Sequence, residues 1–268
     1  MTNEVKSEQH GSRPSKLVHI LDDLRVPYEK DIFFISARGE FNKDKHSRYS
    51  MVKELHGMDE LAEYDLSTLR NVIQPDKMAR LYGIYVNESG GRVHLKGWGW
   101  TREYSIDEYV DRLMKSLGCG YVDGSARGSA RGTAFSRLLR EHAGKSISAT
   151  DIDFFIPKMN MFIEEKNITV SQNGKMIGAL GKGQYYSYRE LMRDFMNRDM
   201  RLSLLSKGRN GDWCVSDLPE FMFITSIPSW GEMVKVPTES TMNDAELSDW
   251  IGNMMNQSSE CAGAMGMI

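Results

Sequence analysis

The chain has 268 residues, of which 40% are hydrophobic and 26% are charged, and its formal net charge is −3. This composition is typical of a globular protein with a real core, and the small negative charge gives no overall argument for binding nucleic acid or an anionic membrane. The three cysteines lack metal-ligand spacing and favour reduced thiols in a cytosolic or nuclear protein. No apolar run approaches the ~20 residues needed to span a bilayer.

Residues 1–58 are predicted to form a flexible N-terminal arm. Residues 1–15 are polar, and Ser15 is expected to cap a short helix with one apolar face. An apolar run follows at residues 32–35, and residues 38–58 are charged and loop-like. We therefore expect an arm with one amphipathic helix, which could dock onto the core or onto a neighbouring molecule.

A core domain is predicted over residues 59–230. Its first hairpin joins strand-like runs at 79–86 and 92–100. A helix follows, in which Ser105 and Glu108 form a capping box and Gly118 provides the end. Further on, Gly-Ser-Ala-Arg occurs twice before a second helical stretch. Four arginines of this region form a candidate electrostatic patch, with an ordinary solvated face as the alternative: Arg127, Arg131, Arg137 and Arg140.

The second half of the chain continues the pattern of hairpins and helices. Asn173-Gly174 predicts the tip of a hairpin over 167–180, and Ser187 with Glu190 predicts a capping box that starts a helix. Two strands joined by a glycine turn follow, and the second carries Trp213. The tail, 231–268, is expected to hold one amphipathic helix capped by Asn243. The fold class is therefore α+β, a single core of antiparallel hairpins packed with two or three helices.

Three collinear blocks of this chain resemble the matrix proteins of rhabdoviruses, especially the vesiculovirus type. They are an acidic and aromatic segment at 59–70, a helix crossing at 102–139, and a terminal helix and strand pair at 186–218. Pro27 and Tyr28 lie where that family carries a Pro-Pro-x-Tyr budding motif, although Val26 replaces the first proline. This loss, and the lack of a basic N-terminal run, would fit a plant-infecting rhabdovirus.

The resemblance implies a viral matrix protein that is not an enzyme and needs no cofactor. Such a protein would self-associate and bridge the ribonucleoprotein to the envelope membrane, condensing the nucleocapsid and promoting budding. Its partners would be other copies of itself, the viral nucleoprotein, an anionic membrane surface, the envelope glycoprotein and host factors. It would lie beneath the virion envelope, and also in the host cytoplasm, endomembranes and nucleus.

An apolar run after residue 153 has two interpretations. In the matrix-protein family the corresponding region is an exposed loop that contacts a neighbouring subunit or lipid, which makes Phe154, Phe155 and Ile156 a candidate contact. The alternative is a buried core strand.

Two other functions compete with the matrix interpretation. Asp151 and Asp153, preceded by Gly132-Thr133, resemble a nucleotidyltransferase signature in which alternating carboxylates hold Mg²⁺. Gly128-Ser129 or Gly132-Thr133 would cradle the phosphates. The gap from the glycine is long for that signature, so a surface turn is the plain alternative. A third hypothesis is single-stranded nucleic-acid binding, with bases stacked on aromatic residues that are otherwise core: Trp98, Trp100 and Tyr104.

Overall fold

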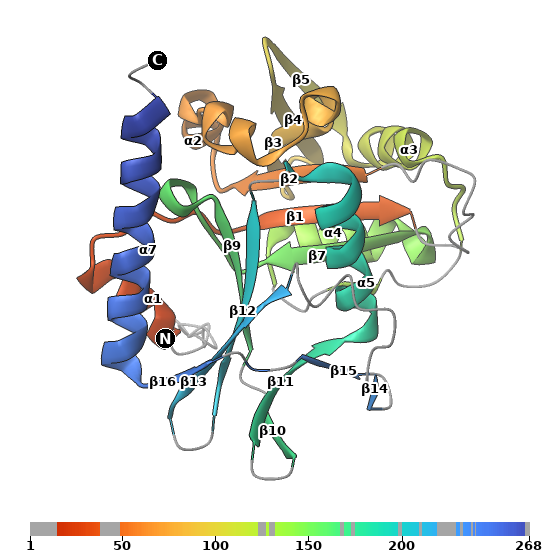
Figure 1. Ribbon diagram of the computed structural model, residues 1–268. Coiled ribbons are helices and arrows are strands. Elements are labelled where there is room, and N and C mark those ends of the chain that lie inside the picture. Colours follow the sequence, from red (N-terminus) through yellow and green to blue (C-terminus); the bar gives the residue numbers. More distant parts are fainter. Residues whose placement is uncertain are drawn as a thin grey trace, which may run out of the picture.

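The structure is a computed structural model that describes residues 15–37, 49–122, 127–128, 132–166, 169–172, 175–197, 200–208, 211–218, 229–230, 233–236, 238 and 240–265. Its strands form three sheets, mostly antiparallel, with helices packed on their faces (Figure 1). The predicted α+β class is confirmed.

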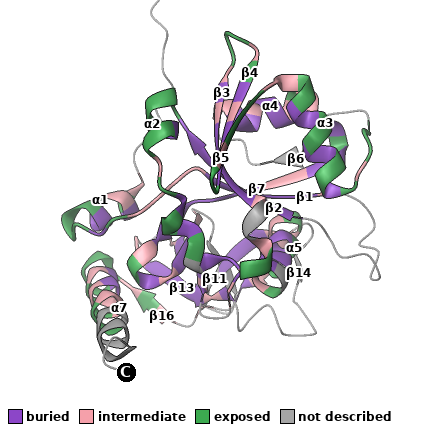
Figure 2. Ribbon diagram, turned by 90° about the horizontal axis from the view of Figure 1, so that it is seen from above, coloured by how far each residue is buried: buried purple, intermediate pink, exposed green. Residues whose placement is uncertain are grey.

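The largest sheet has seven strands in the order β5-β4-β3-β2-β1-β7-β6. Its middle strands, β1 and β2, are almost entirely buried (Figure 2). The prediction of a flexible arm over residues 1–58 is therefore wrong for these segments. A strand that is buried on both faces has a continuous apolar sequence. The run at 32–35 therefore lacks the alternation of apolar and polar residues from which a strand is predicted. The strands are β1 (Ile32–Ala37), β2 (Tyr49–Leu55), β3 (Leu81–Asn87), β4 (Arg92–Gly97), β5 (Trp100–Ser105), β6 (Arg127–Gly128) and β7 (Ile147–Ile152).

Helices cover both faces of this sheet. On one face lie α3 (Ile106–Leu117) and α4 (Ala134–His142), which share an apolar cluster with β1, β3 and β4. Near β3 and β4 lie α2 (Met58–Glu63) and the 3-10 turns Leu66–Val72 and Pro75–Arg80. The predicted cap of α3 is confirmed: the Ser105 N–H donates to Glu108 Oε2 at 2.9 Å, and Gly118 has φ +71°.

The second half of the chain builds the other two sheets, which have the orders β16-β13-β12-β9-β8 and β10-β11-β15-β14. In the first, β9 and β12 run parallel side by side. The predicted hairpin is confirmed by the pairing of Gln172 with Lys175, while its tip lies outside the described residues. The strands are β8 (Phe154–Ile156), β9 (Met161–Lys166), β10 (Thr169–Gln172), β11 (Lys175–Gly181), β12 (Arg201–Lys207), β13 (Trp213–Asp217), β14 (Ser229–Trp230), β15 (Met233–Val236) and β16 (Ser240–Met242). Short 3-10 turns precede β7 (Gly144–Ser146) and β9 (Pro157–Met159).

Helix α5 (Lys182–Glu190) starts earlier than predicted and continues into a π-helical turn, Leu191–Phe195. The predicted capping box of Ser187 and Glu190 is wrong, since both residues lie inside the helix and are buried. The Ser187 hydroxyl donates to the Gly183 carbonyl at 3.0 Å, and Glu190 accepts a hydrogen bond from Tyr49 at 2.6 Å. The same residue types that cap helices can thus bond to other partners from a helix interior.

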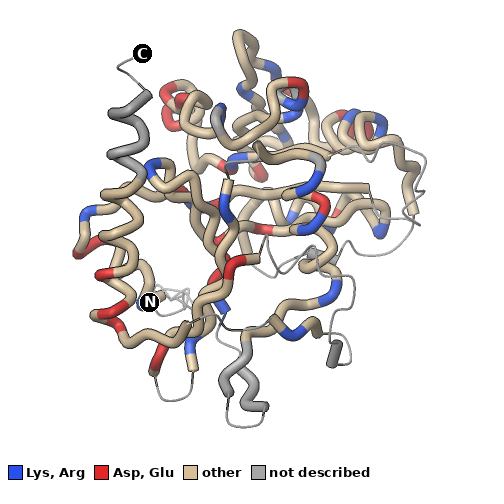
Figure 3. The backbone as a smooth tube through the Cα atoms, viewed as in Figure 1, with Lys and Arg blue, Asp and Glu red and all other residues tan. Residues whose placement is uncertain are grey.

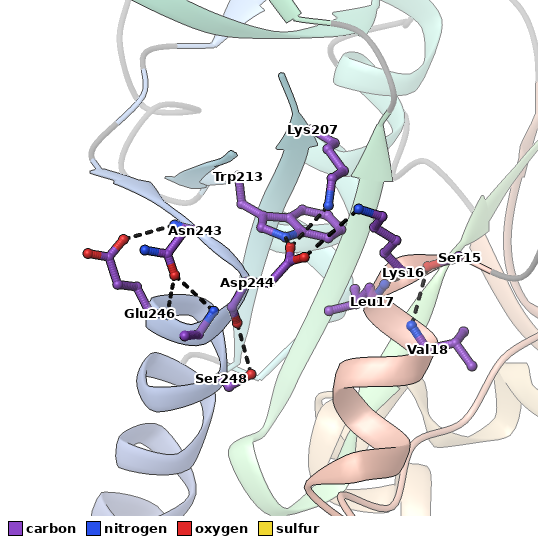
Figure 4. A network of polar contacts seen from close by, with 11 residues as sticks. Ser15, Lys16, Leu17, Val18, Lys207, Trp213, Asn243, Asp244, Glu246 and Ser248 are labelled. Carbon is purple, nitrogen blue, oxygen red and sulfur yellow. Dashed lines mark hydrogen bonds and ion pairs between the residues drawn. The ribbon is translucent and has the colours of Figure 1, made fainter. Parts of the chain in front are cut away.

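The first and last helices, α1 (Lys16–Asp23) and α7 (Asp244–Met265), pack together over the five-stranded sheet. Both predicted caps are confirmed, by Ser15 for α1 and by Asn243 for α7. Asp244 joins the two helices to the sheet (Figure 4). Its carboxylate accepts a hydrogen bond from the Trp213 indole N–H at 2.6 Å and lies 3.1 Å from Lys207 Nζ and 3.9 Å from Lys16 Nζ.

Candidate functional site

A cluster of buried polar side chains lies where the chain passes from the seven-stranded sheet to the five-stranded sheet. Strand β7 ends at Ile152, Asp153 forms a bend, and β8 begins at Phe154. Strand β9 returns antiparallel to β8, and helix α5 packs against its end. This crossing places Asp151 near Glu164, and α5 contributes two further side chains. We call the set the Glu164 cluster: Asp151, Glu164, Lys166, Gln184 and Tyr188.

Glu164 is the centre of this cluster, and only 1% of its surface is exposed. The Tyr188 hydroxyl donates to its Oε2, the Gln184 amide donates to its Oε1 at 2.5 Å, and Lys166 forms an ion pair with it. Gln184 also donates to the Tyr188 oxygen at 3.1 Å. Positions two apart on a strand, and four apart on a helix, lie on one face. This spacing brings Lys166 beside Glu164, and Gln184 beside Tyr188.

Burial and neighbouring charges shift the pKa values of two members of the cluster. Burial raises the pKa of Glu164, and the negative charge of Asp151 raises it further, while Lys166 acts in the opposite direction. Burial, and then the charge of Glu164, raise the pKa of Tyr188 well above its usual value, so Tyr188 keeps its proton and remains a donor. The buried carboxylate of Glu164 thus interacts with both a second carboxylate and a lysine.

The two aspartates predicted to act together have different surroundings. Asp153 is buried, and its Oδ2 accepts the backbone N–H of Glu165 at 2.6 Å. That bond fixes the strand between Glu164 and Lys166. Asp151, also buried, is the aspartate that acts electrostatically on Glu164, and its carbonyl oxygen lies 3.1 Å from the Tyr188 hydroxyl. In the structure, Asp151 therefore acts on Glu164. The sequence motif had predicted that Asp151 acts together with Asp153.

The predicted phosphate cradle at Gly132-Thr133 does not form. Thr133 caps α4, and its hydroxyl accepts the Ser136 N–H at 3.2 Å. The Phe135 N–H donates to the buried carboxylate of Glu54 at 2.9 Å. These amides at the start of α4 are therefore already bonded within the protein. Of the other glycine pair, Gly128-Ser129, the serine lies outside the described residues.

A magnesium ion that shares its ligands with a substrate needs few ligands from the protein. In the described part of the chain, no three His, Cys, Asp or Glu side chains gather closely enough to hold a metal by themselves. Mg²⁺ does not require such a cage, because it keeps several waters and is commonly bound by one or two carboxylates plus substrate phosphates. Asp151 and Glu164 supply that number of carboxylates.

The apolar contact predicted from the matrix-protein resemblance is buried in the structure. Phe154, Phe155 and Ile156 form β8 and are 3%, 0% and 0% exposed. The exposed-loop interpretation is therefore wrong and the core-strand alternative is confirmed. The aromatic rings of Tyr28 and Phe154 meet edge to face at 5.7 Å, and the Tyr28 hydroxyl donates to Asp22, while Pro27 remains exposed.

The four candidate arginines do not act as one group in the described structure. Arg137 binds Glu88 through two hydrogen bonds of 2.8 and 2.7 Å, and Arg140 donates to the Ser136 carbonyl at 3.3 Å. Arg127 lies in β6, where no side chains are described, and Arg131 lies outside the described residues. Figure 3 shows basic and acidic positions interspersed over the molecule.

Sequence reasoning missed four members of the Glu164 cluster. The available signals were Glu164 and Lys166 two residues apart after an apolar run, and Gln184 and Tyr188 four residues apart.

Comparison of the chain with protein-family models, curated proteins and solved structures gave no match. Within the described residues, no helix has the length and apolar character needed to cross a membrane.

Proposed function

We propose that this protein is a magnesium-dependent phosphodiesterase that hydrolyses nucleic acid. The observation that carries the proposal is the convergence of Asp151, Glu164 and Lys166 within one buried network. A magnesium ion bound there would polarise a phosphate oxygen and make a bound water a better nucleophile. Negative charge develops on the phosphate oxygens during hydrolysis, and a lysine and a metal ion held by two carboxylates would stabilise that charge.

Each residue of the cluster has a separate proposed role. Asp151 and Glu164 hold the ion. The Lys166 side chain is 26% exposed, so its ammonium group can reach a phosphate and stabilise charge that develops in the transition state. Gln184 and Tyr188 keep the Glu164 carboxylate oriented, as second-sphere hydrogen bonds commonly do for metal ligands.

Hydrolysis is favoured over nucleotidyl transfer because the glycine segment that would hold a triphosphate is used to cap α4. The matrix-protein function stays a prediction of the sequence. Its apolar candidate residues are buried, and Arg137 is already paired with an acidic residue, so these positions offer no support for it.

The test is cleavage of labelled single-stranded and duplex DNA and RNA by the purified full chain, with Mg²⁺ and with excess EDTA. We expect cleavage with Mg²⁺ only. Glu164→Gln should lower the rate by more than about a hundredfold, the scale seen when transition-state charge stabilisation is removed. Glu165→Gln is the matched control, since this neighbouring carboxylate is on the opposite face of β9.

Circular dichroism and thermal unfolding must show that both variants are folded. The proposal fails if the wild-type protein cleaves none of these substrates with Mg²⁺ or Mn²⁺. It also fails if a folded Glu164→Gln variant keeps the wild-type rate.

A further inference from the structure

A surface of exposed arginines and half-buried aromatic rings lies on the β4–β5 hairpin, at the edge of the seven-stranded sheet. Trp100, Arg102 and Tyr104 alternate along β5 and therefore share one face. The Arg102 guanidinium lies 5.2 Å from the centre of the Trp100 ring, and its Nη1 is 3.4 Å from the Tyr104 hydroxyl. Arg112, from α3, lies 4.7 Å from the centre of the Tyr104 ring.

Trp100 and Tyr104 are half-buried, and both rings pack against the apolar cluster that α3 shares with β3 and β4. A side chain at Gly97 would come within 2.1 Å of the Trp100 ring, so the glycine lets the indole lie flat against the backbone. At the tip of the hairpin, Trp98 is 37% exposed and Arg70 lies 5.8 Å from the centre of its ring, but Arg70 belongs to the 3-10 turn Leu66–Val72 on the opposite face of the sheet. We call the residues of the first face the arginine–aromatic ridge: Trp100, Arg102, Tyr104 and Arg112.

The two arginines of the ridge, Arg102 and Arg112, are exposed and form no ion pair within the described part of the chain. Arg112 acts electrostatically on Glu108, one turn earlier in α3, without forming an ion pair with it. By contrast, Arg92 on the adjacent strand lies 3.5 Å from Glu103, which is on the opposite face of β5. The ridge thus presents two exposed guanidinium groups beside aromatic rings, on a protein whose formal net charge is −3.

The ridge has the chemistry of a surface for single-stranded nucleic acid. Unpaired bases stack on aromatic rings and on guanidinium planes, while arginines also bind the phosphates. A duplex hides its base faces and could use only the charges. Strand order places β5 five strand spacings from β7, about 24 Å at the usual spacing, so the ridge is separate from the Glu164 cluster.

We infer that the arginine–aromatic ridge is a second nucleic-acid contact, which binds a single-stranded segment of the substrate away from the Glu164 cluster. The choice of partner rests on the proposed function, but binding to the ridge needs neither metal nor hydrolysis. The two proposals can therefore fail independently.

The test measures binding of a fluorescein-labelled oligothymidylate of about 20 nucleotides by anisotropy, in EDTA, over a range of salt concentrations. The full-length wild-type chain is compared with Arg102→Gln/Arg112→Gln, and with two control variants from the same hairpin that lie outside the ridge, Trp98→Ala and Arg92→Gln. The double variant should bind at least about tenfold more weakly. Its plot of log affinity against log salt should lose about 1.4 in slope, for two phosphate contacts at ~0.7 each.

Binding of the oligonucleotide should also quench tryptophan fluorescence, and the quenching should persist in Trp98→Ala, which keeps Trp100. The Arg92→Gln control should stay within about twofold of wild type. The inference is overturned if the double variant binds as well as the control, or if a duplex of equal length binds as tightly as the single strand. Equally tight binding of polyglutamate would overturn it as well, since it would show a site for acidic protein. Loss of catalysis with retained ridge binding would count only against the proposed function.

Discussion

Replacing Tyr188 with Phe is the sharpest perturbation of the Glu164 cluster, because it removes one hydroxyl and preserves the packing. Tyr188 is completely buried, and its hydroxyl donates to Glu164 while accepting from Gln184. The phenylalanine ring fills the same space, so no cavity forms. The change therefore isolates the hydrogen bond to the proposed metal ligand.

The expected magnitude follows from this contact. A hydrogen bond to a charged group contributes about 1.5–3 kcal/mol, and loss of a second-sphere partner commonly lowers metal affinity or activity 10–100-fold. That range corresponds to about 1.4–2.7 kcal/mol. We expect the Mg²⁺ concentration for half-maximal cleavage to rise 10–100-fold in Tyr188→Phe.

The assay is the initial rate of cleavage over a Mg²⁺ titration, with direct Mg²⁺ binding by calorimetry. Tyr109→Phe is the matched control, since Tyr109 is also buried and its hydroxyl bonds to the neutral hydroxyl of Tyr82 at 3.1 Å. That variant should lose some stability but keep the wild-type Mg²⁺ dependence. An unchanged Mg²⁺ titration in folded Tyr188→Phe would refute the assignment of Glu164 as a ligand oriented by Tyr188.

Two further predictions concern stability. Burial raises the pKa of Glu164 above its ordinary 4.5, so the native state binds this proton more tightly than the unfolded chain does. The contribution of Glu164 to the free energy of unfolding should therefore fall as the pH rises above about 4.5. Urea titrations in EDTA from that pH to neutrality should give a steeper decline for wild type than for Glu164→Gln, and equal slopes would contradict the assigned shift. In α7, Leu247→Ala should cost about 2–5 kcal/mol, because this side chain is completely buried between α7 and the sheet. The exposed Asp249→Ala should change stability by less than about 0.5 kcal/mol, and equal losses in chemical denaturation would show that α7 is not docked as described.

Sequence patterns predicted the elements whose signals are local. The capping box of α3, the β10–β11 hairpin and the cap of α7 depend on residues close together in the chain, and the structure has all three. Strand β1 was missed because it pairs with β7, far along the chain, and is apolar on both faces.

The candidate site was only partly predictable for the same reason. Asp151 stood out as half of a short motif, but its functional neighbour is fixed by the antiparallel return of β9. Gln184 and Tyr188 reach Glu164 only when α5 packs against that strand. The sequence shows which side chains are capable of the chemistry, whereas the pairing of distant strands decides which of them meet.

The pairing of β1 with both β2 and β7 also has a consequence for synthesis on the ribosome. Strand β1 emerges early, but one of its two edges has no partner until β7 has been made. An apolar strand with an open edge is prone to pair with other chains. This edge of β1 therefore stays open while the whole segment between the two strands is made. Helix α7, which packs with α1 on the five-stranded sheet, follows all of the described strands in the chain.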